Sequence, residues 1–324
     1  MKIRKRLLEL LLATDGLPGW ICVGHPDPQD ELQVSLETSS GVLDIAGNHS
    51  IVALKPLTIA LGAENADLNV VNGSAARLVI REPSRNANGR EPERTLGDIK
   101  LRLSQTLRFE DAYVCLFQTL GGRNFCASAI HRESTYLHER WKMSRNKDAH
   151  NLRMIPAELF SMWIMHHVPR PVCLVSYGGV THGNMFPMDL LGPLSNGVFV
   201  LGMHATSPAI PVWQDAARIA VSTVPLRYKS AVYAMGRNHR EPFLDAATLP
   251  VPCCQSKSFQ IPVPVEALSV RELIIGRSAG LGSHVLFLAR TQRVETRARE
   301  PQMCHVHRFY QQFLIRENRP LPSM

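Results

Sequence analysis

The chain has few cysteines, and their spacing suits neither a disulfide framework nor a zinc site. Seven cysteines occur among the 324 residues, and no C-x-x-C pair is present. An odd number without paired spacing argues against a disulfide scaffold and against a zinc ribbon. We therefore expect reduced cysteines and a cytoplasmic protein.

Long apolar runs are also missing. No stretch of the sequence approaches the roughly 20 apolar residues that a membrane-spanning helix needs, so no membrane partner is expected. The basic and leucine-rich start mimics a signal peptide, but Glu9 interrupts it and no A-x-A-like cleavage site follows. We expect a short amphipathic helix here, docked on the rest of the protein.

Common nucleotide-binding motifs are absent too. The sequence has no G-x-x-x-x-G-K-[ST] loop and no G-x-G-x-x-G segment, which makes a Rossmann domain unexpected. The net charge is +8, but the densest basic stretches, 81–94 and 293–300, are interleaved with acidic residues. Without a basic helix or a recognised motif, no nucleic-acid partner is expected, whereas an anionic small molecule would suit the charge.

The first half of the chain reads as a series of short β-strands without a visible internal repeat. Strands are predicted at 20–24, 32–36, 50–55, 68–71, 77–81, 99–103 and 112–117. Loop composition marks 83–95, and the polar stretch 142–153 is the best linker candidate. We therefore divide the chain into a β-rich N-terminal domain, 1–150, whose role the sequence does not reveal, and a second domain, 151–324.

The second half begins with a predicted helix at 155–167, where Leu159, Met162, Trp163 and His166 share one face. Strands are predicted at 170–177, 196–203, 217–223, 272–277 and 284–291. Helical stretches are expected at 207–216, 226–236 and 305–316. This series of short strands with few helices indicates a small closed or partly closed β-barrel, so we expect a mainly β fold with some α.

Two segments carry the candidate chemistry. Residues 178–208 are rich in Gly, Asn, Ser and Thr, and Ser207 can cap a helix that begins at Pro208, where free N–H groups favour an anion. Residues 276–290 place Ser283 and His284 behind two glycines at the start of an apolar strand. A histidine at that place can be an ordinary turn residue or a ring aimed into a pocket.

The order of these segments resembles the flavin reductase-like, FMN-binding split-barrel family. The matching pieces are R-P-V-C-L-V-S-Y, then Gly183-Asn184 and Pro187, then T-S-P, then A-R-I-A-V-S, and finally L-G-S-H-V-L-F-L-A-R. The resemblance covers residues 154–322, about half of the chain. It implies a C-terminal split barrel, a homodimer with FMN at the subunit interface, and NADH or NADPH as co-substrate.

The resemblance also implies site residues. His284 would lie near the flavin face that the nicotinamide contacts, which makes it the candidate catalytic residue. Backbone amides of the 184–188 loop would bind the isoalloxazine edge. The implied cofactor-binding residues are Asn184, Met185, Phe186, Pro187, Met188, Leu194, Ser195, His204, Thr206, Ser207 and Tyr310. His204 would stand in for the basic residue that often follows the phosphate segment, because the nearest arginine is Arg218.

These features predict an oxidoreductase in which hydride passes from NAD(P)H to the flavin. The protein would hold the two rings together and place donors where negative charge develops. Three alternatives stay open: a flavoenzyme with another acceptor, a non-catalytic flavin- or haem-type binding protein, and a hydrolase or metal enzyme. Candidate metal ligands are His166, His167, His182, His204, His305 and His307, although no carboxylate partner is close to His305 and His307 in sequence.

Overall fold

The computed structural model describes residues 19–65, 67–71, 76–83, 94–145, 152–179 and 182–323, apart from the side chain of Met143. The predicted N-terminal helix lies outside these residues, as do most of the predicted loop 83–95 and residues 146–151 of the linker candidate. No helix within the described ranges is long and apolar enough to cross a membrane.

The C-terminal half forms a curled, seven-stranded antiparallel sheet in the order β11-β10-β14-β17-β18-β13-β12. Its strands are β10 (Cys173–Gly178), β11 (Gly183–Met188), β12 (Leu191–Pro193), β13 (Val198–His204), β14 (Arg218–Thr223), β17 (Ser269–Leu281) and β18 (His284–Thr296). Phe186, Trp213 and Phe287 fill the inside of the curl, in one cluster of buried side chains. The predicted mainly β fold with a split barrel in this half is confirmed.

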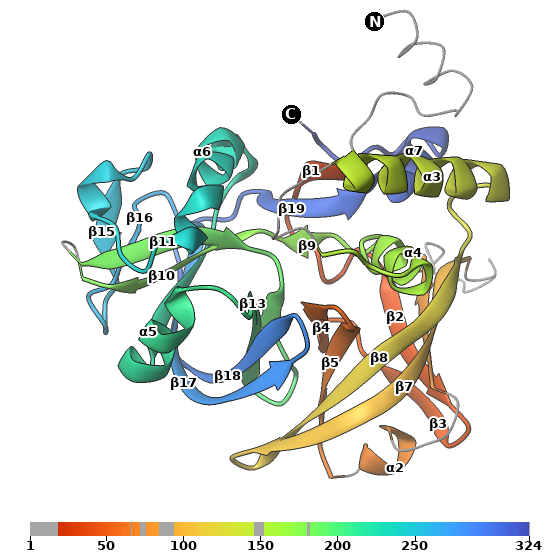
Figure 1. The fold of residues 1–324 in the computed structure, drawn as a ribbon, viewed down its shortest axis with the longest axis horizontal. Coiled ribbons are helices and arrows are strands. Elements are labelled where there is room, and N and C mark those ends of the chain that lie inside the picture. Colours follow the sequence, from red (N-terminus) through yellow and green to blue (C-terminus); the bar gives the residue numbers. More distant parts are fainter. Residues whose placement is uncertain are drawn as a thin grey trace, which may run out of the picture.

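The N-terminal half forms a second seven-stranded antiparallel sheet, in the order β3-β2-β6-β7-β8-β5-β4. Its strands are β2 (Gln33–Thr38), β3 (Gly41–Asp44), β4 (His49–Leu54), β5 (Leu57–Ala63), β6 (Arg77–Arg81), β7 (Thr95–Phe109) and β8 (Ala112–Asn124). Figure 1 shows the two sheets side by side, the N-terminal one in red to yellow and the C-terminal one in green to blue.

The two sheets have the same topology. When the strands of each sheet are numbered from its own first strand, both follow the order 2-1-5-6-7-4-3, and each has a helix between its fourth and fifth strands. The registers also agree. Ala63 pairs with Tyr113, the second residue of β8, and Met203 pairs with Val285, the second residue of β18. The chain therefore holds two copies of one fold, although no repeat is visible in its sequence.

The remaining elements lie around these two sheets (Figure 1). A three-stranded sheet joins β1 (Trp20–His25), β19 (Gln302–His307) and β9 (Arg170–Pro171) in the order β1-β19-β9, and β15 (Cys253–Gln255) pairs with β16 (Pro262–Pro264). The helices are α2 (Leu68–Val71), α3 (Ala129–Arg145), α4 (Pro156–Met165), α5 (Ala209–Ala216), α6 (Lys229–Ala234) and α7 (Arg308–Arg316). Short 3-10 helices are η1 (Leu226–Tyr228), η2 (Met235–Arg240) and η3 (Ala246–Thr248).

An apolar layer holds the two sheets together. β4 lies against β12, β13 and β18 of the other half. The N-terminal half contributes buried Val52, Ala60, Leu107, Phe109, Val114 and Leu116, and the C-terminal half Leu194, Val198, Val200, Leu286 and Leu288. Both α4 and α7, although late in the sequence, pack into the core of the N-terminal sheet. The halves therefore share one continuous interior.

Three local predictions were wrong. Residues 68–71 form α2 and not a strand. The last predicted helix, 305–316, is shorter, because β19 continues to His307 and α7 begins at Arg308. Residues 184–188, predicted as a loop, are part of strand β11. In each case non-local packing outweighs local composition; β19, for example, is paired along its whole length with β1.

Candidate functional site

A cavity of about 320 Å³ lies at the junction of the two halves and contains the predicted catalytic histidine. The C-terminal sheet contributes His204 and His284 at the ends of neighbouring strands. The other walls come from β1, β4, α3, α4 and β19. Its further lining residues are Gly19, Trp20, Leu54, Glu139, Leu152, Met154, Leu159, Met162, Trp163 and His307.

Two histidines form the C-terminal wall of this cavity. His204 and His284 are direct cross-strand partners, and their ring centroids are 5.6 Å apart in an edge-to-face arrangement. Thr206 Oγ1 lies 2.8 Å from Nδ1 of the His204 ring. The fold therefore brings His204, Thr206 and His284 together, although Thr206 does not line the cavity.

The turn before His284 is fixed by the N-terminal half. Gly282 adopts φ +61°, which glycine tolerates without a steric penalty. The Ser283 N–H donates to the Lys55 carbonyl at 2.8 Å, and the Lys55 N–H donates to Ser283 Oγ at 3.0 Å. Ser283 Oγ is also 2.8 Å from His284 Nδ1. A turn of one half thus orients the histidine of the other.

The opposite wall is aromatic. The His307 ring stacks on Trp163 with centroids 5.2 Å apart and planes 21° apart, and Trp20 meets His307 edge-on at 5.1 Å. His307 Nδ1 accepts from the Phe309 N–H at 3.3 Å. In the neutral ring Nε2 therefore carries the hydrogen. These flat, apolar surfaces suit a planar ring system.

Burial keeps the ring of His284 neutral at physiological pH. His284 is 4% exposed. Its burial, together with a smaller repulsion from His204, lowers its pKa to about 4. Burial also holds the pKa of His307 well below its usual range. The cavity therefore offers neutral imidazoles as hydrogen-bonding groups, and it offers no strong general acid near pH 7.

The other predicted cofactor-binding side chains do not line this cavity. Asn184 is committed to structure, since its Nδ2 donates to the Asn238 and Glu241 carbonyls at 2.9 and 2.6 Å. Met185 and Phe186 are core residues of two different clusters. Pro187 and Met188 pair with Leu174 and Cys173 of β10.

Leu194, Ser195, Ser207 and Tyr310 also have structural contacts. Leu194 belongs to the apolar layer between the halves, and the Ser195 N–H donates to Asn48 Oδ1 at 2.9 Å. Ser207 Oγ accepts from the Ala209 N–H at 3.4 Å, but α5 begins one residue later than predicted and its N-cap residue is Pro208, so the prediction that Ser207 caps this helix is wrong. The Tyr310 hydroxyl donates to Glu31 at 2.5 Å inside the N-terminal core.

The cavity fits part of a flavin. Its apolar and aromatic walls match an isoalloxazine ring, and its volume is at the lower end of the roughly 300–1,000 Å³ of small-molecule sites. No arginine or lysine is among the described residues that line it. The residues present therefore fit a ring, while a phosphate would need a partner outside this cavity.

The hydrolase and metal alternatives find no geometric support in the described residues. Residues 276–280 match the letters of a G-x-S-x-G elbow, but they run within β17, and Ser278 Oγ accepts from Gln214 at 3.1 Å. An elbow needs a strand-to-helix turn. The part of the chain that the structure describes contains no group of three potential metal ligands. His305 is held between Asp189 and Tyr233.

Several lining residues went unnoticed as site residues in the sequence. Trp163 and Met162 lie on the helical face that the sequence marks, but nothing in the sequence shows that this face meets a cavity. Trp20 and Leu54 come from strands that precede the histidines of the cavity by 150 residues or more in the sequence. Only the tertiary structure brings them together.

Comparisons with known proteins find similar proteins among solved structures. No family model and no curated protein matches the chain. Among solved structures, it resembles an FMN-binding protein from Thermus thermophilus (22% identity, TM-score 0.36, over 40% of this chain and 74% of that one). It also resembles an NADH:FAD oxidoreductase from Streptomyces globisporus C-1027 (15%, 0.41, 48% and 93%). A third is the flavin reductase PheA2 (14%, 0.39, 46% and 94%).

Proposed function

We propose that this protein is a flavin-binding oxidoreductase in which NADH or NADPH reduces a flavin. The observation that supports this best is the cavity between the halves, where an aromatic wall faces His204 and the neutral ring of His284. Such a site can hold a planar, redox-active ring and exclude water from it. A bound flavin, FMN in the first instance, would supply the hydride chemistry.

Each wall has a role in this proposal. Trp20, Trp163 and His307 form an aromatic wall against which a ring can pack. His284 offers a neutral imidazole whose orientation is fixed by Ser283 and by the Lys55 turn. Holding two rings in contact lowers the entropic barrier to hydride transfer, so no ionised general base is required.

One chain can form the site that the resemblance places between two subunits. The resemblance predicts a homodimer, but here Leu54 of the N-terminal sheet and Trp163 of α4 complete the cavity around His284. We propose that the second sheet takes the place of a partner subunit, and that a homodimer is not needed to close the site. Analytical ultracentrifugation of the FMN-loaded protein checks this: binding of FMN to a 36.1 kDa species supports it.

Whether the protein is catalytic and where in the cell it acts are both part of the proposal. A non-catalytic flavin-binding protein is the second candidate, because the walls of the cavity could hold a ring without taking part in its reduction. We place either activity in the cytoplasm, on the cysteine usage described above. Measurement of NADH and NADPH oxidation, with free FMN as acceptor, separates the two candidates.

The test is an FMN titration followed by fluorescence quenching, with His284→Ala as the key variant. We expect saturable FMN binding by the wild type. His284→Ala should slow single-turnover flavin reduction more than it weakens FMN binding, because the ring positions the nicotinamide. His182→Ala is the matched control, since His182 stacks on Phe243 outside the cavity.

Two outcomes would contradict the proposal. A protein that binds neither FMN nor FAD at micromolar concentration would not be a flavoprotein. A His284→Ala variant that loses FMN binding but keeps its reduction rate per bound flavin would reject the nicotinamide role of this residue.

A further inference from the structure

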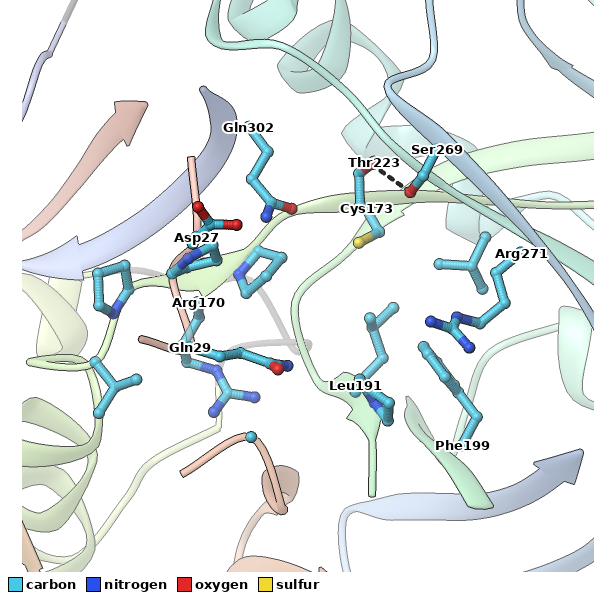
Figure 2. Close-up of a pocket in the computed structure, with 18 of the residues that line it drawn as sticks. Asp27, Gln29, Arg170, Cys173, Leu191, Phe199, Thr223, Ser269, Arg271 and Gln302 are labelled. Carbon is cyan, nitrogen blue, oxygen red and sulfur yellow. Dashed lines mark hydrogen bonds between the residues drawn. The ribbon is translucent and has the colours of Figure 1, made fainter. Parts of the chain in front are cut away.

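A second cavity, of about 310 Å³, is lined by residues of both halves and shares no lining residue with the first. Figure 2 shows its walls, with Arg170 and Gln29 on one side and Arg271 beside Phe199 on the other. Loops of the N-terminal half contribute Asp27, Pro28, Gln29, Asp30, Gly47 and His49. The remaining lining residues are Val168, Pro169, Pro171, Cys173, Leu191, Gly192, Pro193, Val221, Thr223, Ser269 and Gln302.

Arg170 is a buried cation that forms no ion pair among the described residues, although the Asp189 carboxylate attracts it from a longer distance. Its side chain is on β9 and is 6% exposed. Nη2 donates to the Asp189 carbonyl at 3.0 Å and to Ser50 Oγ at 3.4 Å. Nε is buried and has no hydrogen-bond partner. The Asp189 carboxylate pairs instead with His305, 3.1 Å away.

Arg271 faces the same cavity from β17. Its Nη1 donates to Thr291 Oγ1 at 3.0 Å, and its guanidinium lies 5.5 Å from the centre of the Phe199 ring. These contacts fix the plane of the guanidinium without neutralising its charge. Among the described residues, no ion pair involves Arg170 or Arg271.

Other deeply buried charges in this molecule are compensated. Asp98 accepts from Arg77 at 2.8 Å and from Arg123 at 2.9 Å. Glu272 accepts from Ser256 Oγ at 2.7 Å and from the Phe259 N–H at 2.7 Å. Arg170 has no such direct contact with a charged partner in the described part of the chain. Burial lowers its pKa to about 10, the more distant Asp189 carboxylate opposes that shift, and the side chain stays charged at neutral pH. A buried charge that is only partly compensated is costly unless a ligand neutralises it.

The surroundings of the two arginines favour a small acidic molecule. Gln29 and Gln302 add amide donors, and Thr223 and Ser269 add hydroxyl groups, which bond to each other at 2.7 Å (Figure 2). The acidic residues of the cavity, Asp27 and Asp30, are exposed, so solvent screens them. The buried guanidinium therefore dominates the potential in the interior of the cavity.

We propose that this cavity binds a small organic anion whose carboxylate or phosphate group contacts Arg170, with Arg271 attracting it from the opposite wall. Guanidinium groups bind both acids through two parallel N–H donors. This proposal does not rest on the proposed flavin chemistry. The same anionic group can come from a free metabolite-like acid or from the phosphate of FMN, and the experiment distinguishes the two.

The first experiment measures thermal stability in the presence of sodium succinate or inorganic phosphate, each against sodium chloride of equal ionic strength. We expect either anion to raise the Tm of the full-length wild type in the millimolar range. Arg170→Met should abolish the rise. Arg293→Met, at an exposed arginine of β18, should retain it. A matched control of this kind separates a site from a general charge effect.

The second experiment compares FMN with riboflavin by calorimetry. If Arg170→Met weakens FMN binding roughly tenfold or more and leaves riboflavin unchanged, the anion is the flavin phosphate. If FMN and riboflavin bind as in the wild type while the succinate or phosphate effect is lost, the ligand is a separate acid. Arg170→Lys, which keeps the charge but not the fork, should weaken binding less than Arg170→Met and serves if the latter does not fold.

Two results would overturn the proposal. One is that none of succinate, phosphate or the phosphate group of FMN is bound by the wild type above the chloride control. The other is that binding is equally strong in Arg170→Met. Loss of flavin binding alone, with the succinate or phosphate effect intact, would count against the proposed function and not against this site.

Discussion

At the scale of single residues, buried neutral histidines are the feature with the widest consequences. His166 and His167 are almost fully buried, and burial lowers the pKa of each to about 3. His167 accepts from Asn124 through Nε2, 3.1 Å away. His166, His167 and His284 can be buried only as neutral rings, because no carboxylate contacts them among the described residues. Their titration therefore links folding to pH.

We predict that stability falls steeply in mild acid. The folded-state pKa values of His166, His167 and His284 lie below the ordinary value of 6.5. The unfolded chain thus binds more protons between about pH 6.5 and 4, and stability that is complete above pH 6.5 is lost as pH falls. Each group contributes at most about 1.4 kcal/mol per pH unit. Urea denaturation at pH 7.5, 6.5 and 5.5 measures this effect.

The same measurement on His167→Asn provides the check. The free energy of unfolding of this variant should change less steeply with pH than that of the wild type. The difference in slope should correspond to about one proton, whatever the stability of the variant at pH 7.5. Equal stability of the wild type at pH 7.5 and 5.5 would contradict the prediction.

At the scale of elements, α4 is positioned by a single buried carboxylate. Pro156 begins the helix, and Glu158 accepts from the Ile155 N–H at 3.1 Å and from the Leu57 N–H of β5 at 3.4 Å. Side-chain acceptors at a helix start satisfy N–H groups that have no partner in the helix. Glu158 thus fixes the helix that carries Trp163 to the N-terminal sheet.

We expect Glu158→Ala to lower the free energy of unfolding by about 1.5–3 kcal/mol, the usual value for hydrogen bonds to a charged group. Glu158→Gln keeps an acceptor and should cost less. Equilibrium urea denaturation is the measurement, and Glu133→Ala, at an exposed position of α3, is the control. If both alanine variants are equally stable, Glu158 does not anchor the helix.

At the scale of the whole molecule, the two sheets approach closely at topologically equivalent glycines. Gly62 pairs with Val114 and Gly202 pairs with Leu286, and each partner is the third residue of its strand. A Cβ on Gly202 would be 2.0 Å from the Val52 carbonyl oxygen, and one on Gly62 would be 3.0 Å from the Leu194 Cβ. The equivalent of His284 in the N-terminal sheet is Ala112, so only the C-terminal sheet carries the histidine.

Gly202→Ala should therefore push the two halves apart. Because the clash is with backbone, we expect a loss of about 2 kcal/mol or more in the free energy of unfolding. Gly236→Ala, where an added Cβ meets nothing within 4 Å, should change it by no more than about 0.5 kcal/mol. Thermal and urea denaturation of both variants test this. A Gly202→Ala variant as stable as the wild type would show that the halves are not packed as described.

Local structure was predictable where the pattern itself has a physical cause. The strands at 77–81 and 217–223 follow from apolar residues between turn residues, and the Gly282-Ser283 turn from the positive φ that glycine tolerates. The C-terminal barrel followed from the order of motifs. By contrast, the 184–188 segment looked like a ligand loop, because sequence alone does not show that Phe186 and Trp213 fill the same core.

The sequence by itself determined most strands, the helix that carries Trp163, and a histidine behind two glycines. Only the tertiary structure decided that the chain folds into two sheets of one topology, because strand order depends on contacts between residues far apart and many different side chains can satisfy it. It also decided what His284 faces. Trp20, Leu54 and Trp163 reach that cavity through docking of the halves, driven by apolar burial that no local pattern encodes.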